Sequence, residues 1–341
     1  MQNISKHRDA LMGVAILWIM VFHAEMTFPS WLAPLTWIQE TGYGGVDIFL
    51  FLSGLGLYFS LDKNPNVGRF YRNRLLRILP TYWAVILFSA AAEYILLHRR
   101  TPIVELFYML STVGFWINAT KFDWYIPSLL VLYAVFPLYF AFFRRTRWAT
   151  AFMIAIGLAL SLVLANTRWD YLLIFTTRIP IFFMGAFLGY LLRRVGPGNA
   201  GYGLRKGPTP APPGPPSVPI AIASAALGLA GLIIAFQIYT PEQRWHNGTW
   251  WYPFILITPP LCAGLAAIMR KAKILSWLGR YSLEIYLVHT IFFGLHKETA
   301  RFFAFDPSGI SAYLVYMLLT LPFAYVLHQV MSKLKFRTRH V

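Results

Sequence analysis

The sequence is poor in cysteine and in acidic residues. Cys262 is its only cysteine, which excludes an internal disulfide and a thiolate metal cluster. Charged residues make up only 13% of the 341 positions, about half the share found in soluble domains. A chain with so little charge cannot keep a water-compatible surface. The length alone would allow two soluble domains, but the composition excludes them.

The sequence contains many long apolar segments. Hydrophobic residues make up 57% of the chain, and its mean hydropathy is +0.55. A helix needs about 20 mostly apolar residues to cross a bilayer. We therefore expect an all-α, polytopic integral membrane protein with ten transmembrane helices. The expected spans are residues 10–28, 45–61, 79–97, 124–143, 148–165, 172–192, 219–238, 251–269, 276–295 and 311–332.

Basic residues set the expected orientation. The formal net charge of +17 would suggest nucleic acid as the partner of a soluble protein. Here the basic residues lie in short loops, where they set topology and meet anionic lipid headgroups, so we expect no nucleic-acid binding. With both chain ends in the cytoplasm, most of them fall on the inside, as the positive-inside rule requires. The outside segments then hold Arg99, Arg100, Lys121, Arg168, Arg178, Arg244, Lys297 and Arg301.

A segment rich in glycine and proline, residues 195–219, divides six expected spans (10–192) from four (219–332). Such a composition forms neither a helix nor a packed core. We expect it to be a cytoplasmic linker inside one membrane domain that covers residues 1–341. The internal repeats of many transporters are missing. Residues 105–118 are expected to form a re-entrant or interfacial helix on the outer side.

Two ionisable residues fall at a similar depth in the first two expected spans. His23 lies in the outer half of the first span. An ionisable group inside a membrane helix is costly and suggests a function, and histidine is the usual general base near neutral pH. Asp47 begins the second span and could orient the imidazole of His23. The alternatives are a neutral His23 that ties two helices together and an Asp47 that caps its own helix.

Other polar and aromatic residues of the spans are candidates for substrate binding. His289 in the ninth span could bind substrate, relay protons or hold helices together, and Glu284 could pair with Arg280 one turn earlier. Ser53, beside Gly54, is a candidate nucleophile or substrate contact, although small residues also let helices approach closely. Trp124 and Tyr133 complete the set, although aromatic residues also suit a membrane interface.

Four arginines, Arg69, Arg72, Arg74 and Arg77, precede the third span on its inner side. On a helix they would form a basic face, with Leu75, Leu76 and Ile78 on the other side. Guanidinium groups bind phosphate in a fork, so this face suits an anionic headgroup or a phosphate-rich cofactor. The alternative is a plain interfacial anchor.

Several of these segments together resemble the membrane acyltransferase-3 family of bacterial multipass acyltransferases. The matching segments are Arg8-Asp9 leading to His23-Ala24, Gly45-Val46-Asp47 followed by Ser53-Gly54, Arg74-Leu75-Leu76-Arg77-Ile78-Leu79-Pro80-Thr81-Tyr82, Trp124 followed by Tyr133 and Pro137, and Leu278-Gly279-Arg280-Tyr281-Ser282 leading to Ile285-Tyr286-Leu287-Val288-His289. Their order and spacing cover nearly the whole chain.

The resemblance implies roles for some of these residues. The family moves an acyl group, often acetyl, from cytoplasmic acyl-CoA to hydroxyls of carbohydrates or other envelope molecules. His23 would be the essential histidine, and Arg74 and Arg77 would help to bind the acyl donor. Many members carry an arginine eleven residues before the histidine, where this chain has Met12. Arg8 lies one turn earlier and is expected to bind CoA in its place.

We therefore expect an O-acyltransferase of the inner (plasma) membrane that uses acyl-CoA, with acetyl-CoA as the first candidate, and no metal. The acceptor is expected to be a hydroxyl of an envelope carbohydrate or glycolipid, with membrane lipids around the protein. The alternative is a transporter or flippase of an envelope glycan or lipid intermediate, with His23 and His289 as proton relays. The sequence leaves the acyl chain, the exact acceptor, a covalent intermediate and the oligomeric state open.

Overall fold

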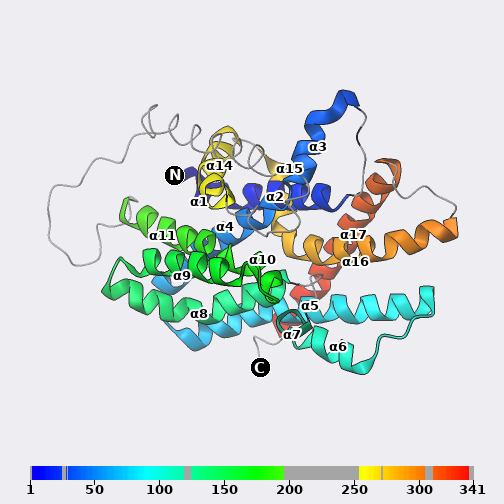
Figure 1. Cartoon of the computed structure of the whole chain (residues 1–341), viewed down its shortest axis with the longest axis horizontal. Coiled ribbons are helices and arrows are strands. Elements are labelled where there is room, and N and C mark those ends of the chain that lie inside the picture. Colours follow the sequence, from blue (N-terminus) through cyan, green and yellow to red (C-terminus); the bar gives the residue numbers. More distant parts are fainter. Residues whose placement is uncertain are drawn as a thin grey trace. The chain divides into compact units, whose positions relative to one another are not determined.

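The computed structural model describes residues 2–24, 28, 30–118, 124–195, 253–269, 272–303 and 310–337. Within these residues every regular element is a helix, as predicted (Figure 1). The predicted span 219–238 and the predicted linker, apart from its first residue, lie outside the described residues.

The helices are α1 (Gln2–Lys6), α2 (Arg8–His23), η1 (Ser30–Leu32), α3 (Ala33–Glu40), α4 (Gly44–Lys63), α5 (Val67–Leu97), α6 (Ile103–Leu110), α7 (Gly114–Asn118), α8 (Tyr125–Arg145), α9 (Ala149–Leu164), η2 (Asp170–Leu172), α10 (Leu173–Thr176), α11 (Ile179–Val195), α14 (Pro253–Ile268), α15 (Lys273–Arg280), α16 (Ser282–Phe303) and α17 (Ile310–Arg337).

Five helical segments among the described residues are long and apolar enough to cross a membrane. They are Gly44–Lys63, Val67–Leu97, Tyr125–Arg145, Asp170–Arg194 and Tyr313–Lys333. Each contains most of one predicted span. Shorter apolar helices cover Ala149–Leu164, Phe254–Ile268 and Ser282–Phe292, which also fall within predicted spans. The total of ten spans and the cytoplasmic position of both ends stay predictions.

Two predicted spans are interrupted. The ninth, residues 276–295, breaks at Tyr281, which separates α15 from α16. Glycine is a poor helix residue and is common where helices end, and Gly279 lies near the end of α15. The sixth, residues 172–192, breaks at Arg178, between α10 and α11. Arg178 is only 1% exposed, so it is buried among the helices, and its predicted place on the outer side stays a prediction.

The chain divides into two compact units. The first unit comprises Met1–Leu11, Asp47–Val67 and Ala134–Lys273, and the second comprises Met12–Val46, Gly68–Tyr133 and Ile274–Val341. Several helices, among them α2, α4 and α8, begin in one unit and end in the other.

In the first unit, α4 and α11 pack with their backbones almost in contact. A Cβ atom added at Gly54 would lie 1.9 Å from the Phe182 carbonyl oxygen, and one at Gly185 would lie 1.9 Å from that of Phe51. Only glycine fits at such an approach, so the prediction that small residues beside Ser53 bring helices together is confirmed. Aromatic rings from α8 and α11 fill the space alongside, with Tyr139 and Phe183 centred 4.5 Å apart.

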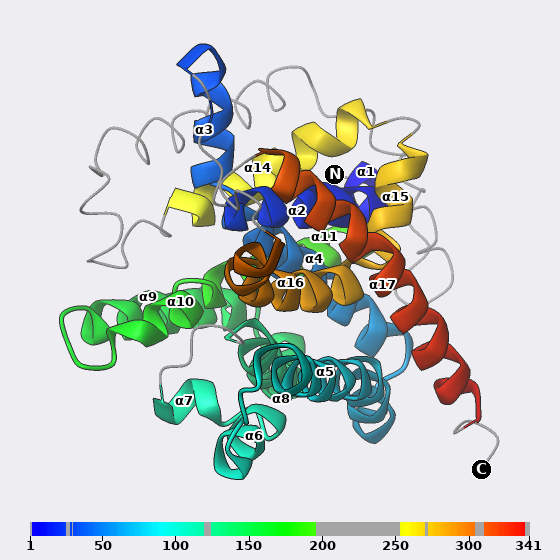
Figure 2. The same cartoon turned by 90° about the vertical axis from the view of Figure 1, so that its right-hand side faces the viewer.

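In the second unit, α16 and α17 lie side by side, and α2 is tied to α15 and α17 (Figure 2). A Cβ atom at Gly13 of α2 would lie 2.0 Å from the Leu275 carbonyl oxygen of α15. The Tyr313 hydroxyl of α17 donates a hydrogen bond to the Met20 carbonyl. The hydrogen bond to Met20 holds the carboxyl-terminal turn of α2, where His23 lies.

The predicted re-entrant or interfacial segment, residues 105–118, contains two short helices, α6 and α7. Tyr82 and Trp83 of α5 donate hydrogen bonds to the carbonyls of Met109 and Leu110, at 3.0 and 2.9 Å. These bonds hold the end of α6 against α5, and α6 is too short to cross a bilayer by itself.

Candidate active site

Two histidines meet in the second unit. His23 is the last residue of α2, and His289 lies in α16. Nε2 of His289 is 3.3 Å from Nδ1 of His23, and the ring centroids are 5.2 Å apart. His289 is 1% exposed, while His23 is half-buried. The two histidines that the sequence singles out in separate predicted spans therefore lie side by side.

A row of aromatic rings runs from the histidine pair to the start of α8. The Tyr286 ring is centred 5.4 Å from His289 and 4.8 Å from the Tyr125 ring. Tyr125 in turn contacts the ring of Trp124, at 6.0 Å. The predicted substrate residue Trp124 is thereby linked to the histidines through Tyr125 and Tyr286, which the sequence does not single out as site residues. Tyr133 is also buried, two turns further along α8.

Glu284 lies in the first turn of α16 and is fully buried. Its Oε1 accepts a hydrogen bond from Nδ1 of His328, on α17, at 2.9 Å. The Tyr281 ring packs on the imidazole of His328 at 4.7 Å. The sequence predicts Arg280 as the partner of Glu284, but the helix that would align them is broken at Tyr281. His328 was not singled out from the sequence; the signal that could have found it is a histidine inside the last predicted span.

The four arginines occupy the first turns of α5, and they do not share one face. Arg74 is half-buried on the side of Phe70 and Ile78, which are each 3% exposed, whereas the other three arginines are exposed. Leu75, predicted for the side opposite the arginines, is 41% exposed. Arg74 differs from the other three arginines because positions 70, 74 and 78 recur every four residues and lie on one buried side of the helix.

Arg74 has an unusual environment. Its guanidinium lies over the Phe70 ring, 5.7 Å from the centroid. Its Nε is buried and has no hydrogen-bond partner within the part of the chain that the structure describes. A buried donor without a partner is costly, and the role predicted for Arg74 in binding the acyl donor stays a prediction.

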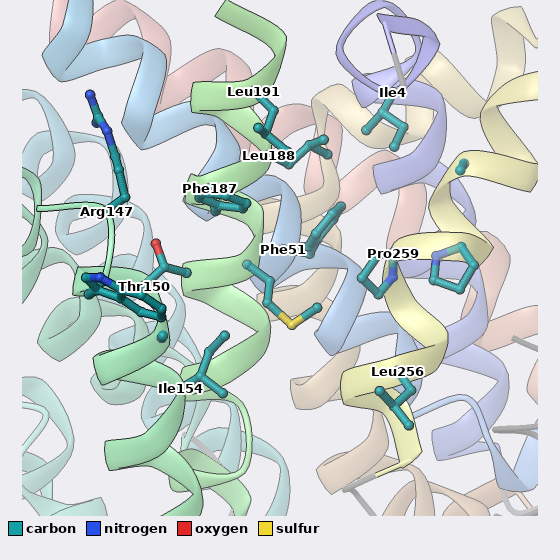
Figure 3. Close-up of a pocket in the computed structure, with 15 residues that line it drawn as sticks. Ile4, Phe51, Arg147, Thr150, Ile154, Phe187, Leu188, Leu191, Leu256 and Pro259 are labelled. Atoms are coloured by element: carbon teal, nitrogen blue, oxygen red, sulfur yellow. The ribbon is translucent and has the colours of Figure 1, made fainter. Parts of the chain in front are cut away.

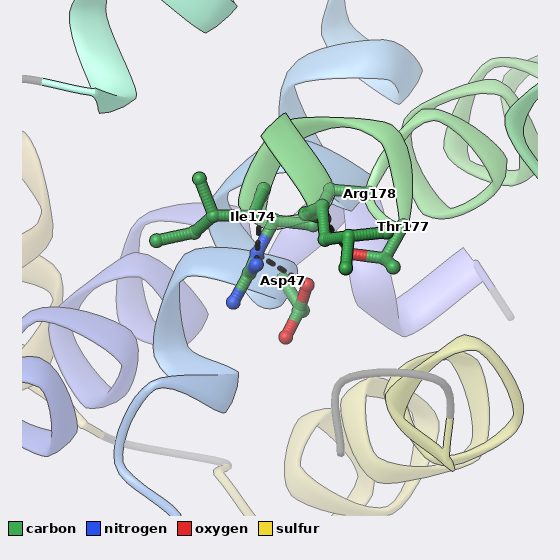
Figure 4. Close-up of polar contacts among 5 residues, drawn as sticks. Asp47, Ile174, Thr177 and Arg178 are labelled. Atoms are coloured by element: carbon green, nitrogen blue, oxygen red, sulfur yellow. Dashed lines mark hydrogen bonds and ion pairs between the residues drawn. The ribbon is translucent and has the colours of Figure 1, made fainter. Parts of the chain in front are cut away.

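Asp47 lies in the first unit, in the first turn of α4, and pairs with Arg178 (Figure 4). The Arg178 Nε is 3.1 Å from the Asp47 Oδ1, and both side chains are at most 1% exposed. Arg178 also donates to the Ile174 carbonyl at 2.8 Å. The pairing of Arg178 with Asp47 was not predicted from the sequence; the signal that could have found it is a single arginine inside an otherwise apolar run. The predicted role of Asp47 in orienting His23 stays a prediction.

Ser53 and Arg8 also belong to the first unit. Ser53 is 8% exposed on α4, beside the close approach at Gly54. The Nε of Arg8 donates to the Leu52 carbonyl of α4 at 3.4 Å. The guanidinium of Arg8 also lies beside Gly56, where an added Cβ would be 3.3 Å from a terminal nitrogen. The roles predicted for Ser53 and Arg8 stay predictions.

The first unit also contains an apolar pocket of about 670 Å³ between α9, α11 and α14 (Figure 3). Its lining includes Phe51, Ile154, Leu188 and Pro259, with Arg147 as its one charged residue. The volume is typical of ligand pockets, and the lining suits hydrocarbon. The predicted site residues do not line it.

Comparison with known proteins decides the chemistry. The sequence matches the family model of an acyltransferase domain, acyltransferase family 3, over residues 9–329. The chain belongs to acyltransferase family 3. A search of curated proteins and a search of solved structures found no match.

As an acyltransferase, the protein needs a base for the acceptor and a place for the acyl donor. The histidine pair on α2 and α16 is the candidate for the base, since histidine is the commonest general base of enzymes. The arginines of α5 offer cationic donors. Both groups belong to the second unit. The apolar helices and the family together indicate a multi-pass membrane protein.

Proposed function

We propose that this acyltransferase is an O-acyltransferase of the inner membrane. It moves an acyl group, acetyl first among the candidates, from cytoplasmic acyl-CoA to a hydroxyl of an envelope carbohydrate or glycolipid. The observation that carries the proposal is the imidazole of His23, at the end of α2 in the first predicted span, which lies 3.3 Å from a second histidine. A general base of this kind is what a hydroxyl needs to attack a thioester.

The reaction balances with the groups at hand. His23 removes the proton of the acceptor hydroxyl while the oxygen attacks the thioester carbonyl. The C–S bond then breaks, and the departing CoA thiolate takes the proton back from the imidazolium. The products are an ester and free CoA, and His23 returns to its starting form. General-base catalysis of this kind supplies about 10²–10⁴-fold in rate.

The donor side of the proposal rests on α5. This helix has 31 residues, so it is about 46 Å long and exceeds the hydrocarbon thickness of about 30 Å. Its arginines therefore extend beyond the apolar part, on the side that the positive-inside rule assigns to the cytoplasm. CoA is polyanionic and does not cross membranes, so its phosphates would be bound from this side. Arg74 would supply an Nε that has no hydrogen-bond partner among the described residues.

The proposal is tested with radiolabelled acetyl-CoA and longer acyl-CoAs, added to membranes that contain the protein and to an envelope extract. We expect label in alkali-labile esters of the carbohydrate or glycolipid fraction, and release of CoA that depends on the extract. Membranes without the protein are the control. If no acyl-CoA donates label, acyl-CoA is not the donor. Movement of glycan across the membrane without acyl-CoA would favour the transporter alternative.

A further inference from the structure

We infer that His289 is a positioning residue that keeps the proton of His23 on Nδ1, so that Nε2 is the nitrogen that accepts a proton. The inference rests on the proposed function for the role of His23 as base. The position of the proton, however, is a property of the resting protein and can be measured without any substrate.

Three contacts assign the protons of the pair, and His289 has a further hydrogen bond with the backbone of Tyr286. Nδ1 of His23 lies 2.9 Å from the Ile19 carbonyl oxygen. Nδ1 of His289 lies 3.1 Å from the Ile285 carbonyl oxygen. The third contact joins Nε2 of His289 to Nδ1 of His23, at 3.3 Å. A carbonyl oxygen only accepts hydrogen bonds, so each Nδ1 must be the donor toward its carbonyl.

The third contact then has one consistent assignment. A neutral imidazole carries a proton on one nitrogen and a lone pair on the other. With its proton on Nδ1, His289 offers the lone pair of Nε2 to His23. The Nδ1 proton of His23 is thus shared between Ile19 and His289, and the lone pair of His23 is on Nε2. The reverse assignment would point two nitrogen lone pairs at carbonyl oxygens, one at Ile19 and one at Ile285.

The surroundings keep this arrangement in place. His289 is 1% exposed and packs against the ring of Tyr286, so its ring has little freedom to turn. Free histidine in water prefers the proton on Nε2, which would leave the lone pair of His23 facing Ile19 and His289. In this pair the proton of His23 is therefore on Nδ1, opposite to the preference of free histidine.

The consequence for catalysis resembles the role of the aspartate in a Ser-His-Asp triad, with a neutral imidazole in place of the carboxylate. His289 fixes the tautomer, and it accepts the Nδ1 hydrogen bond when His23 becomes an imidazolium during transfer. Loss of the triad aspartate lowers kcat by about 10⁴-fold. His289 is neutral, and the Ile19 carbonyl remains as an acceptor when His289 is removed. We therefore expect the loss of His289 to lower kcat by about 10²-fold, less than the loss of the triad aspartate.

The test is ¹⁵N NMR of the full-length protein, labelled at histidine, in lipid nanodiscs under alkaline conditions where the imidazoles are neutral. Signals are assigned by comparison with His23→Asn and His289→Gln variants. We expect a protonated Nδ1 and an unprotonated Nε2 for His23 in the resting wild type. A protonated Nε2 on His23 would overturn the inference, whatever the protein does with acyl donors.

Two variants test the part played by His289. In His289→Gln the side-chain oxygen can accept in place of Nε2, so the His23 tautomer should persist and acyl transfer should stay within about tenfold of wild type. In His289→Ala the proton should shift toward Nε2 and transfer should fall about 10²-fold. His98→Gln, at an exposed position after α5, is the control and should match wild type.

The outcomes separate this inference from the proposed function. If His289→Ala keeps the tautomer and the activity, His289 is not the positioning residue. If Ala and Gln variants lose activity equally while both fold, the hydrogen-bond role is also wrong. If the wild type shows the expected tautomer but transfers no acyl group, the proposed function fails while the assignment of the protons stands.

Discussion

Three pairs of ionisable side chains join different helices of the described part of the chain. His23 meets His289, Asp47 meets Arg178, and Glu284 meets His328. An unpaired polar group in an apolar surrounding is costly, so such pairs hold helices together whatever else they do. An effect on activity therefore has to be separated from an effect on stability.

Variants of Asp47 and Arg178 can separate an effect on activity from an effect on stability. Asp47→Leu and Arg178→Met should each lower the free energy of unfolding by about 3–5 kcal/mol, because each leaves a buried charge without its counter-charge. The double variant should regain much of this loss, since a buried ion pair can be replaced by apolar residues. Thermal unfolding in detergent measures all three against wild type.

The double variant also tests the predicted role of Asp47 in orienting His23. If Asp47 has that role, the double variant is folded but transfers acyl groups more slowly than wild type. A folded double variant with the wild-type rate would show that the carboxylate serves only its ion pair. Single variants as stable as wild type would contradict the importance of the pair itself.

At the scale of elements, the approach of α4 to α11 depends on glycine. Gly54→Ala should destabilise the protein by about 1–3 kcal/mol, the usual cost of overpacking, because its Cβ would overlap the Phe182 carbonyl of α11. Gly264→Ala on α14 is a matched control with no atom within 4 Å of the added Cβ. Equal unfolding temperatures for the two variants would show that α4 and α11 are not in this close contact.

The arginine-rich start of α5 gives a second prediction for an element. Arg74→Gln should weaken acetyl-CoA binding about 10–100-fold, since a hydrogen bond to a charged group contributes about 1.5–3 kcal/mol. Arg72→Gln, at an exposed position of the same helix, should have a smaller effect. Titration of the protein with acetyl-CoA measures both. An equal loss of acetyl-CoA affinity in the two variants would favour a diffuse basic face. Unchanged affinity in both would favour a membrane anchor.

At the scale of the whole molecule, the sequence predicts best those features that depend on neighbouring residues in the chain. A run of about 20 apolar residues is a local property, so the spans predicted at 45–61 and 124–143 agree with α4 and α8 within a few residues. Family membership was also within reach, because several short motifs occur in order. The break at Tyr281 was not predicted, although the polar run Gly279-Arg280-Tyr281-Ser282 lies there, because an average over about 19 residues smooths out so short a run.

The contacts that the site residues make with each other could not be predicted from the sequence. His23 and His289 are 266 positions apart, and hydropathy does not say which faces of two apolar helices meet. The side of α5 that Arg74 occupies was mispredicted for the same reason: which stripe of an amphipathic helix is buried depends on the helices packed against it.

The predicted topology can be tested on the whole molecule. Cys262 is buried, and Cys262→Ser gives a background without cysteine. Single cysteines at Lys6, Lys63 and Arg145 should react with a membrane-impermeant maleimide only after the membrane is opened, because these positions are predicted to be cytoplasmic. A cysteine at Arg99 should react in intact cells. The reverse pattern would place the arginines of α5 outside, away from cytoplasmic acyl-CoA.

The central claim is that His23 is the base of the acyl transfer. His23→Asn tests it most directly, because the asparagine amide can still donate toward Ile19 and His289 but cannot act as a base. With labelled acetyl-CoA and envelope extract, we expect the variant to unfold at the wild-type temperature and to transfer acyl groups about 10²–10⁴-fold more slowly. A folded His23→Asn protein with the wild-type transfer rate would contradict the claim.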